Sequence, residues 1–106
     1  MAKFLIQASY TADGAKGILK EGGSARKAQI GQILEKLGGR VEAFYYAFGE
    51  SDVVAIFEAP DTATATALSM AVNASGGVKL KTTPLITPEE IDQATKKSIS
   101  YRAPGA

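Results

Sequence analysis

Four short stretches of the chain each predict a β-strand, whose side chains point to opposite faces in turn: the first and last alternate between apolar and polar residues, and the middle two are apolar on both faces. The stretches are residues 3–10, 40–48, 52–59 and 78–83. The middle two are rich in β-branched and aromatic side chains and flank a short loop at Gly49, which predicts an antiparallel hairpin. Pro84 has no N–H for a sheet ladder, so the last strand is expected at an edge or an end of the sheet.

Between these stretches, apolar residues recur at helical spacing. The clearest helix spans residues 24–37, with Ser24 as the expected N-cap and two glycines after its last residue. A second helix is predicted over residues 62–74, where Asp61 is the expected cap and Gly76 follows the end.

Two further segments carry weaker or shorter helical signals. Residues 11–21 have Asp13 as a candidate cap, but two glycines each lower the helix propensity by about 1 kcal/mol relative to alanine. Residues 87–90 read Thr-Pro-Glu-Glu, the pattern of a capping box, and the helix that they start is expected to end near Lys97. Residues 98–106 show no periodicity and are expected to form a tail.

The order of these elements is β-α-β-β-α-β with a helix added at the end. Right-handed crossovers in such a split βαβ arrangement place both main helices on one face of an antiparallel sheet and leave the other face open. The central hairpin is apolar on both faces, so large side chains are expected on the open face too. Because burying each of them contributes about 1.5–3 kcal/mol, we expect two copies to stack their sheets as a homodimer, which larger assemblies can repeat.

Composition narrows the class of protein. The chain has 106 residues, 45% of them hydrophobic, and a formal net charge of +1, which predicts one globular domain over residues 1–97 and a tail over 98–106. The balanced charge gives no sign of nucleic-acid binding. No apolar stretch reaches the roughly 20 residues that span a bilayer, and the start of the chain lacks the apolar region of a signal peptide. A cytoplasmic location is therefore expected, with no membrane contact.

The chain contains neither cysteine nor histidine. Disulfides, thiolate nucleophiles, imidazole bases and imidazole ligands for metal or haem are therefore excluded. Carboxylates remain for a hard metal ion, but the sequence predicts no metal site and no other cofactor.

A set of residues spread over most of the chain makes it similar to a known family. The set is Tyr10-Thr11, Gly14, Arg26, Leu37-Gly38-Gly39, Phe44-Tyr45, Gly49 with Asp52, Glu58-Ala59-Pro60-Asp61, and Thr82. With these residues the chain resembles the GYD domain family, small bacterial proteins of the dimeric α+β barrel superfamily, from about Phe4 to about Ile91. The family takes its name from Gly-Tyr-Asp, and Ser51 stands here where the family usually has tyrosine.

The resemblance implies an α+β, ferredoxin-like fold in which two subunits form a dimeric α+β barrel. It implies little about chemistry, because the superfamily includes cofactor-free monooxygenases, haem-degrading enzymes, chlorite dismutases, lactone isomerases and ligand-binding regulatory domains. A role of the family's tyrosine cannot be transferred to Ser51.

Six side chains are candidates for a functional site. They are Asp52 and Tyr45 as catalytic residues, and Tyr10, Arg26, Tyr46 and Glu58 as ligand-binding residues. Asp52 either caps the hairpin turn or, if desolvation raises its pKa, accepts a proton, with Tyr45 or Arg26 stabilising the negative charge that develops. Arg26, close to the start of its helix, also suits a carboxylate or phosphate.

Each candidate has a structural interpretation as well. Aromatic side chains at strand spacing are typical of a core or an interface, and a basic turn around Arg26 is typical of a solvated surface. Glu58 is expected to form an ion pair with Arg40, Lys79 or Lys81. It follows Asp52 by about 20 Å along one strand face, so these two carboxylates cannot form a catalytic pair.

Three functions are compatible with these features. The first is a cofactor-free enzyme acting on a small apolar or aromatic molecule between sheet and helices, which the superfamily analogy favours. The second is a ligand-binding or regulatory module, which the missing acid–base and metal-binding residues favour. The third is a structural assembly unit that uses the lysine-bearing last strand and the tail at 98–106 as contacts.

Overall fold

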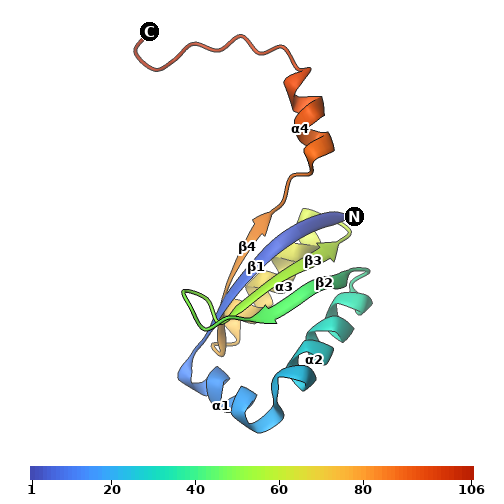
Figure 1. Ribbon diagram of the computed structural model, residues 1–106, viewed down its shortest axis with the longest axis vertical. Helices are drawn as coiled ribbons and strands as arrows, with labels where there is room; N and C mark the ends of the chain where they lie inside the picture. Colours follow the sequence, from blue (N-terminus) through green and yellow to red (C-terminus); the bar gives the residue numbers. More distant parts are fainter.

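Four antiparallel strands form one sheet in the order β2-β3-β1-β4 (Figure 1). The computed structural model, which describes residues 1–106, places them at Ala2–Tyr10 (β1), Arg40–Tyr46 (β2), Val53–Ala59 (β3) and Val78–Pro84 (β4). β1 pairs with β3 on one side and with β4 on the other, and β2 pairs with β3. The predicted ferredoxin-like α+β fold is confirmed, and β4 is an edge strand, as Pro84 indicates.

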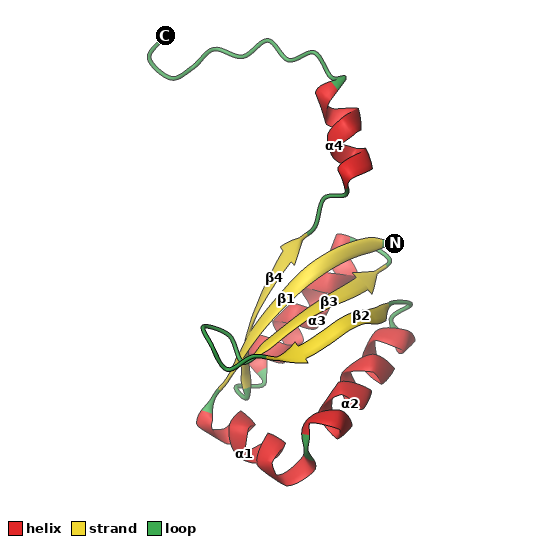
Figure 2. Ribbon diagram, viewed as in Figure 1, coloured by secondary structure: helices red, strands yellow, loops and turns green.

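Four helices accompany the sheet: Ala12–Glu21 (α1), Gly23–Lys36 (α2), Thr62–Ala74 (α3) and Pro88–Thr95 (α4). α2 and α3 lie over one face of the sheet, α1 joins the end of β1 to α2, and α4 stands away from the body (Figures 1 and 2). None of the four combines the length and the apolar character that crossing a membrane requires.

The core lies between the sheet and the helices. Its buried residues are Phe4, Ile6, Ala8, Ile30, Leu34, Val53, Ala55, Phe57, Ala59, Ala65 and Val78. Alternate residues of β1 from Phe4 to Ala8 and of β3 from Val53 to Ala59 belong to this set, which confirms the period-two pattern of both strands. α2 contributes only Ile30 and Leu34, one turn apart, so its buried stripe is narrower than its apolar pattern suggests.

The other face of the sheet carries apolar side chains that no helix covers. Leu5 lies opposite Ile56, which lies opposite Ala43, and Tyr45 lies opposite Val54. Tyr45 is 71% exposed, and the other four are only partly buried. These five residues form a continuous apolar patch over β1, β3 and β2, called here the open-face stripe.

The two later helices begin where the sequence predicts. The Asp61 carboxylate accepts the N–H of Thr64 at 2.7 Å and caps α3. At α4, Thr87 accepts the N–H of Glu90 while the Glu90 side chain accepts the N–H of Thr87, so the predicted capping box is present.

The caps predicted for the two earlier helices are wrong. α1 is a regular helix capped by Thr11, not by Asp13. α2 begins at Gly23, and Ser24 makes no capping bond; the cap position is Gly22, whose φ of 86° lies in the left-handed region that favours glycine. The sharp turn at Gly22 joins α1 directly to α2, which leaves no room for the extended residue that a serine cap requires.

The start of α1 packs on the loop between α3 and β4. The Thr11 hydroxyl donates to the Gly76 carbonyl at 2.9 Å, and the Thr11 N–H donates to the Gly77 carbonyl at 3.1 Å. A Cβ atom at Gly14 would lie 1.9 Å from the Gly77 carbonyl oxygen, so only glycine allows this approach. These contacts set the place where β1 ends and α1 begins.

Two alanine substitutions in α1 are expected to have opposite effects. Gly14→Ala should lower the free energy of unfolding by about 1–3 kcal/mol, because the added methyl group pushes α1 away from the loop. Gly17→Ala should raise it by about 0.5–1 kcal/mol, because nothing lies within 4 Å of a Cβ there and alanine favours the helix. Urea unfolding measures both, and equal effects would contradict the close packing at Gly14.

Candidate functional site

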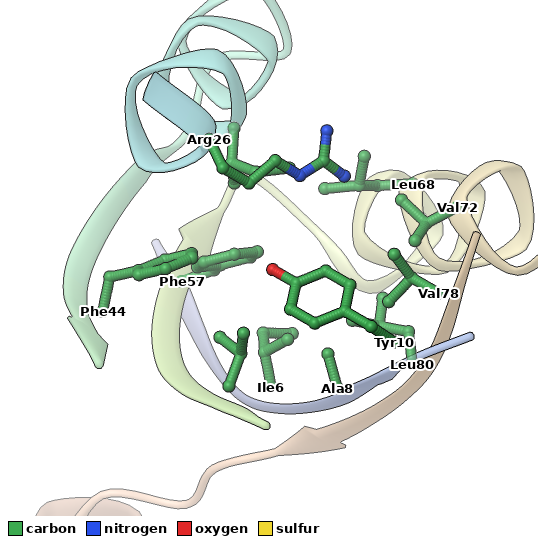
Figure 3. A pocket seen from close by; sticks show the side chains of 12 residues that line it. Ile6, Ala8, Tyr10, Arg26, Phe44, Phe57, Leu68, Val72, Val78 and Leu80 are labelled. Carbon is green, nitrogen blue, oxygen red and sulfur yellow. The ribbon is translucent and has the colours of Figure 1, made fainter. Parts of the chain in front are cut away.

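An apolar cavity of about 40 Å³ lies between the helices and the sheet (Figure 3). All four strands, α2 and α3 contribute to its wall, and 11 of its 12 lining residues are hydrophobic. The twelfth is Arg26, from the first turns of α2. This space, called here the inner cavity, is therefore apolar with a single cation in its wall.

The guanidinium of Arg26 lies over the inner cavity (Figure 3). Its Nη1 donates to Oε1 of Gln29 at 3.4 Å, and neither of the two ion pairs in the structure includes it. Arg26 is half-buried, so part of its hydration is removed without a carboxylate in exchange. A guanidinium in such surroundings is suited to pair with an anion that arrives from solution.

Tyr10, at the end of β1, points its hydroxyl into the inner cavity below Arg26 (Figure 3). Partial burial raises the pKa of Tyr10 to about 12; the neighbouring Tyr46 adds to the rise and Arg26 opposes it. At neutral pH Tyr10 is therefore an uncharged phenol, able to donate a hydrogen bond but not to act as a base.

Tyr46 holds the start of α2 in place. Its hydroxyl donates to the Gly23 carbonyl at 3.0 Å, and a Cβ at Gly23 would lie 2.9 Å from its ring. The ring also meets Phe44 edge-to-face, with centroids 5.5 Å apart, and Phe44 lines the inner cavity. Tyr46 thus supports the segment that carries Arg26.

A second, more polar hollow of about 250 Å³ adjoins the inner cavity. It lies between α1 and the loop before β4, and it shares Tyr10, Arg26 and Val78 with the inner cavity. Glu21, at the end of α1, is its one acidic residue. This outer hollow and the inner cavity are therefore separated by a common rim, with polar groups on the outside and apolar groups on the inside.

The two residues predicted to be catalytic lie elsewhere. The Asp52 carboxylate accepts the N–H of Tyr10 at 2.9 Å and so ties the hairpin loop to the end of β1. Tyr45 belongs to the open-face stripe, on the opposite side of the sheet from Arg26. Neither residue lines the inner cavity or the outer hollow, so the structure does not bring Asp52 and Tyr45 together with Arg26.

Glu58 also lies away from both hollows. It is only 7% exposed and forms an ion pair with Arg40, its direct neighbour in the β2–β3 register. Of the three ion-pair partners expected from the sequence, the structure selects Arg40. The hydrogen bond from this guanidinium holds the pKa of the Glu58 carboxyl below its usual range.

Sequence reasoning missed most of the cavity wall. Phe44, Leu68 and Val72 were interpreted as ordinary apolar positions, and the pattern holds no sign that they leave a gap between them. The one available signal was alternation, which puts Phe44 on the same face as Tyr46. No group of three carboxylates is placed to share a metal ion.

A family model of the GYD domain matches residues 4–95. The chain belongs to the GYD domain family. Comparisons with curated proteins and with solved structures give no match. In this GYD domain, Ser51 occupies the hairpin loop, where its carbonyl accepts the N–H of Gly49 at 3.2 Å, and it lines neither hollow. The GYD match includes Tyr10, Arg26 and the whole of α4.

The Arg40–Glu58 ion pair is expected to make stability depend on acid. Because the folded-state pKa of Glu58 is lowered, its contribution is present above the ordinary value near 4.5 and is lost as the pH falls through the folded pKa. Arg40→Gln should therefore lower the free energy of unfolding at pH 7, and its difference from the natural protein should shrink below pH 4. Denaturant unfolding from pH 3 to 7 measures this, and a difference independent of pH would exclude the pair as its cause.

Proposed function

We propose that this GYD protein is a homodimer that binds small molecules with an apolar body and one anionic group, such as aromatic carboxylates. The observation that carries the proposal is the position of Arg26, which lines both the inner cavity and the outer hollow and has no acidic partner. The apolar body of the ligand enters the inner cavity, and its carboxylate stays at the rim, beside the guanidinium and the Tyr10 hydroxyl.

The size of the inner cavity sets a condition on binding. Its volume of about 40 Å³ is well below the roughly 150 Å³ of an apolar cavity that holds benzene. Tyr10 stands on the rim between the two hollows and is only partly buried. Rotation of its side chain joins the two spaces, so an aromatic ligand is expected to displace the Tyr10 ring when it binds.

Binding accounts for the site better than catalysis does. Tyr10 stays protonated at neutral pH, Arg26 is a permanent cation, and Asp52, the base expected from the sequence, accepts the N–H of Tyr10 and lines neither hollow. A proton acceptor is therefore missing from the wall of the inner cavity.

An enzymatic role is the second candidate, and one observation favours it. Tyr10 and Arg26 are two hydrogen-bond donors beside each other at the rim, which is an arrangement that stabilises a developing oxyanion. A substrate that supplies its own proton acceptor, or reacts through water, would be turned over at this rim. Chromatography of each bound compound after incubation with the protein separates turnover from binding.

The homodimer is supported by the open-face stripe. Leu5 lies opposite Ile56, and Tyr45 lies opposite Val54, on a sheet face that no helix of the same chain covers. A contiguous exposed apolar patch of this kind is typical of an interaction surface. A second copy supplies the same stripe in return, and two sheets packed face to face bury both.

Removal of the cation at the rim is expected to weaken ligand binding. With benzoate as the probe, Arg26→Gln should raise the Kd by about tenfold or more, because a hydrogen-bonded ion pair is lost. Lys27→Gln is the control, since Lys27 is the next residue of α2 but is exposed and lines neither hollow. Isothermal titration calorimetry measures both, and a natural protein that binds benzamide as tightly as benzoate would contradict the role of Arg26.

A charge on the open face is expected to separate the subunits. Tyr45→Glu should shift the particle from twice the 11.0 kDa chain mass toward a single chain, because the open-face stripe can no longer be buried without an unpaired carboxylate. Leu19→Glu is the control, as Leu19 is an equally apolar, exposed residue on α1. Sedimentation equilibrium measures the mass, and a natural protein that stays a single chain at every concentration would exclude the dimer.

A further inference from the structure

The C-terminal arm, residues 85–106, leaves the sheet and does not return to it (Figures 1 and 2). From Pro88 to the end of the chain every residue is exposed. The arm nevertheless carries large apolar side chains, among them Ile99 and Tyr101, which are 78% and 75% exposed. A hollow of about 820 Å³ lies between the base of the arm and the first residues of β1. The arm therefore exposes apolar side chains that the rest of the chain does not cover.

α4 has good local signals but is too short to be stable alone. It has eight residues, a complete capping box and proline in its first turn. Isolated helices shorter than about 12–15 residues are marginal in water even in favourable sequences. Its helical form therefore depends on packing against another surface.

The base of the arm directs α4 away from its own sheet. The N–H of Leu85 donates to the Lys3 carbonyl at 2.9 Å and prolongs the pairing of β4 with β1. Thr87 is already engaged in the capping box. Only Ile86 lies between the residue held on β1 and the first residue of the capping box, and α4 points away from the sheet that it follows (Figures 1 and 2).

The charges of α4 and β4 are complementary. α4 contains Glu89, Glu90 and Asp92 and no basic residue. β4 contains Lys79 and Lys81, which alternate with the inward-facing Val78 and Leu80 and so lie on the open face of the sheet. Both lysines are exposed, and neither takes part in an ion pair.

We propose that the arm is exchanged between two copies of the chain, so that the acidic side of α4 in each copy docks on Lys79 and Lys81 of the other. This inference rests on the proposed dimer and adds a second contact to it. The reach is sufficient: residues 85–87, which connect β4 to α4, extend up to about 10 Å, α4 adds about 12 Å, and two sheets packed face to face lie about 10 Å apart.

Charge reversal on each side of the contact tests the exchange. The strand variant is Lys79→Glu with Lys81→Glu on β4, and the arm variant is Glu89→Lys with Asp92→Lys on α4. Glu90 is left unchanged because its side chain belongs to the capping box. Each variant alone brings like charges together, so its dimer dissociation constant should rise about tenfold at low salt.

Mixing the two variants decides between exchange and a contact within one chain. In a mixed dimer, the acidic arm of the strand variant meets Lys79 and Lys81 of the arm variant. The basic arm of the arm variant meets the two new glutamates on β4 of the strand variant. Both contacts are then attractive, so the mixture should form a heterodimer with a dissociation constant within about threefold of the natural protein. Sedimentation with one variant fluorescently labelled measures this, and Lys16→Glu with Lys27→Glu, on α1 and α2, is the control.

Three results would overturn the exchange. Variants that dimerise like the natural protein would show that α4 does not meet these lysines, and that another partner covers the arm. Variants that are both weakened but do not recover on mixing would place each arm on its own body. A natural protein that remains a single chain would remove the proposed dimer as well, whereas the first two results leave that dimer intact.

Discussion

The bond from the Tyr10 N–H to the Asp52 carboxylate holds together the end of the molecule that carries the candidate site. It ties the hairpin loop to the central strand at the residue where β1 ends. One residue later, Thr11 bonds to the loop before β4 and caps α1. The backbone at Tyr10 is therefore held at the rim between the two hollows by contacts on both sides, and the position of Arg26 above it follows from the path of α1 into α2.

Several of the residues that carry the family resemblance have structural roles here. Thr11 and Gly14 fit α1 to its loop, Asp52 anchors the hairpin, and Asp61 caps α3. A Cβ at Gly39 would lie 2.2 Å from the Glu58 carbonyl oxygen, so this position too requires glycine. Membership of the GYD family is therefore informative about the fold, whereas the proposed function rests on the few residues, Arg26 among them, that face the hollows.

Local signals in the sequence were sufficient for the strands and for the caps of α3 and α4. Each of those features depends on residues within four positions of one another, as in the capping box at Thr87. The caps predicted for α1 and α2 were wrong. The position of Thr11 is fixed by a hydrogen bond to a loop more than sixty residues away, and the cap at Gly22 is fixed by the turn between two helices. Contacts between distant segments leave no periodic signal.

The face occupied by each aromatic residue of the hairpin was equally hard to predict. Alternation separates Tyr45 from Tyr46, but both faces of the hairpin are apolar, so the pattern does not say which face meets the helices. A register shift between Val41 and Ala43 adds to the ambiguity. The inner cavity could not be predicted from the sequence for a further reason. A gap in packing depends on how side chains from six elements fit together, and composition does not encode that fit.

The two apolar faces of the hairpin place the side chains of β2 in two different surroundings. β2 is an edge strand, hydrogen-bonded to β3 alone, so its position depends strongly on side-chain packing. On one face, Phe44 lines the inner cavity and Tyr46 holds the start of α2. On the other, Tyr45 meets the second subunit of the proposed dimer. In the proposed dimer, packing against Tyr45 restricts the same strand that supports Arg26, so the proposed ligand binding and the proposed assembly depend on one element of the sheet.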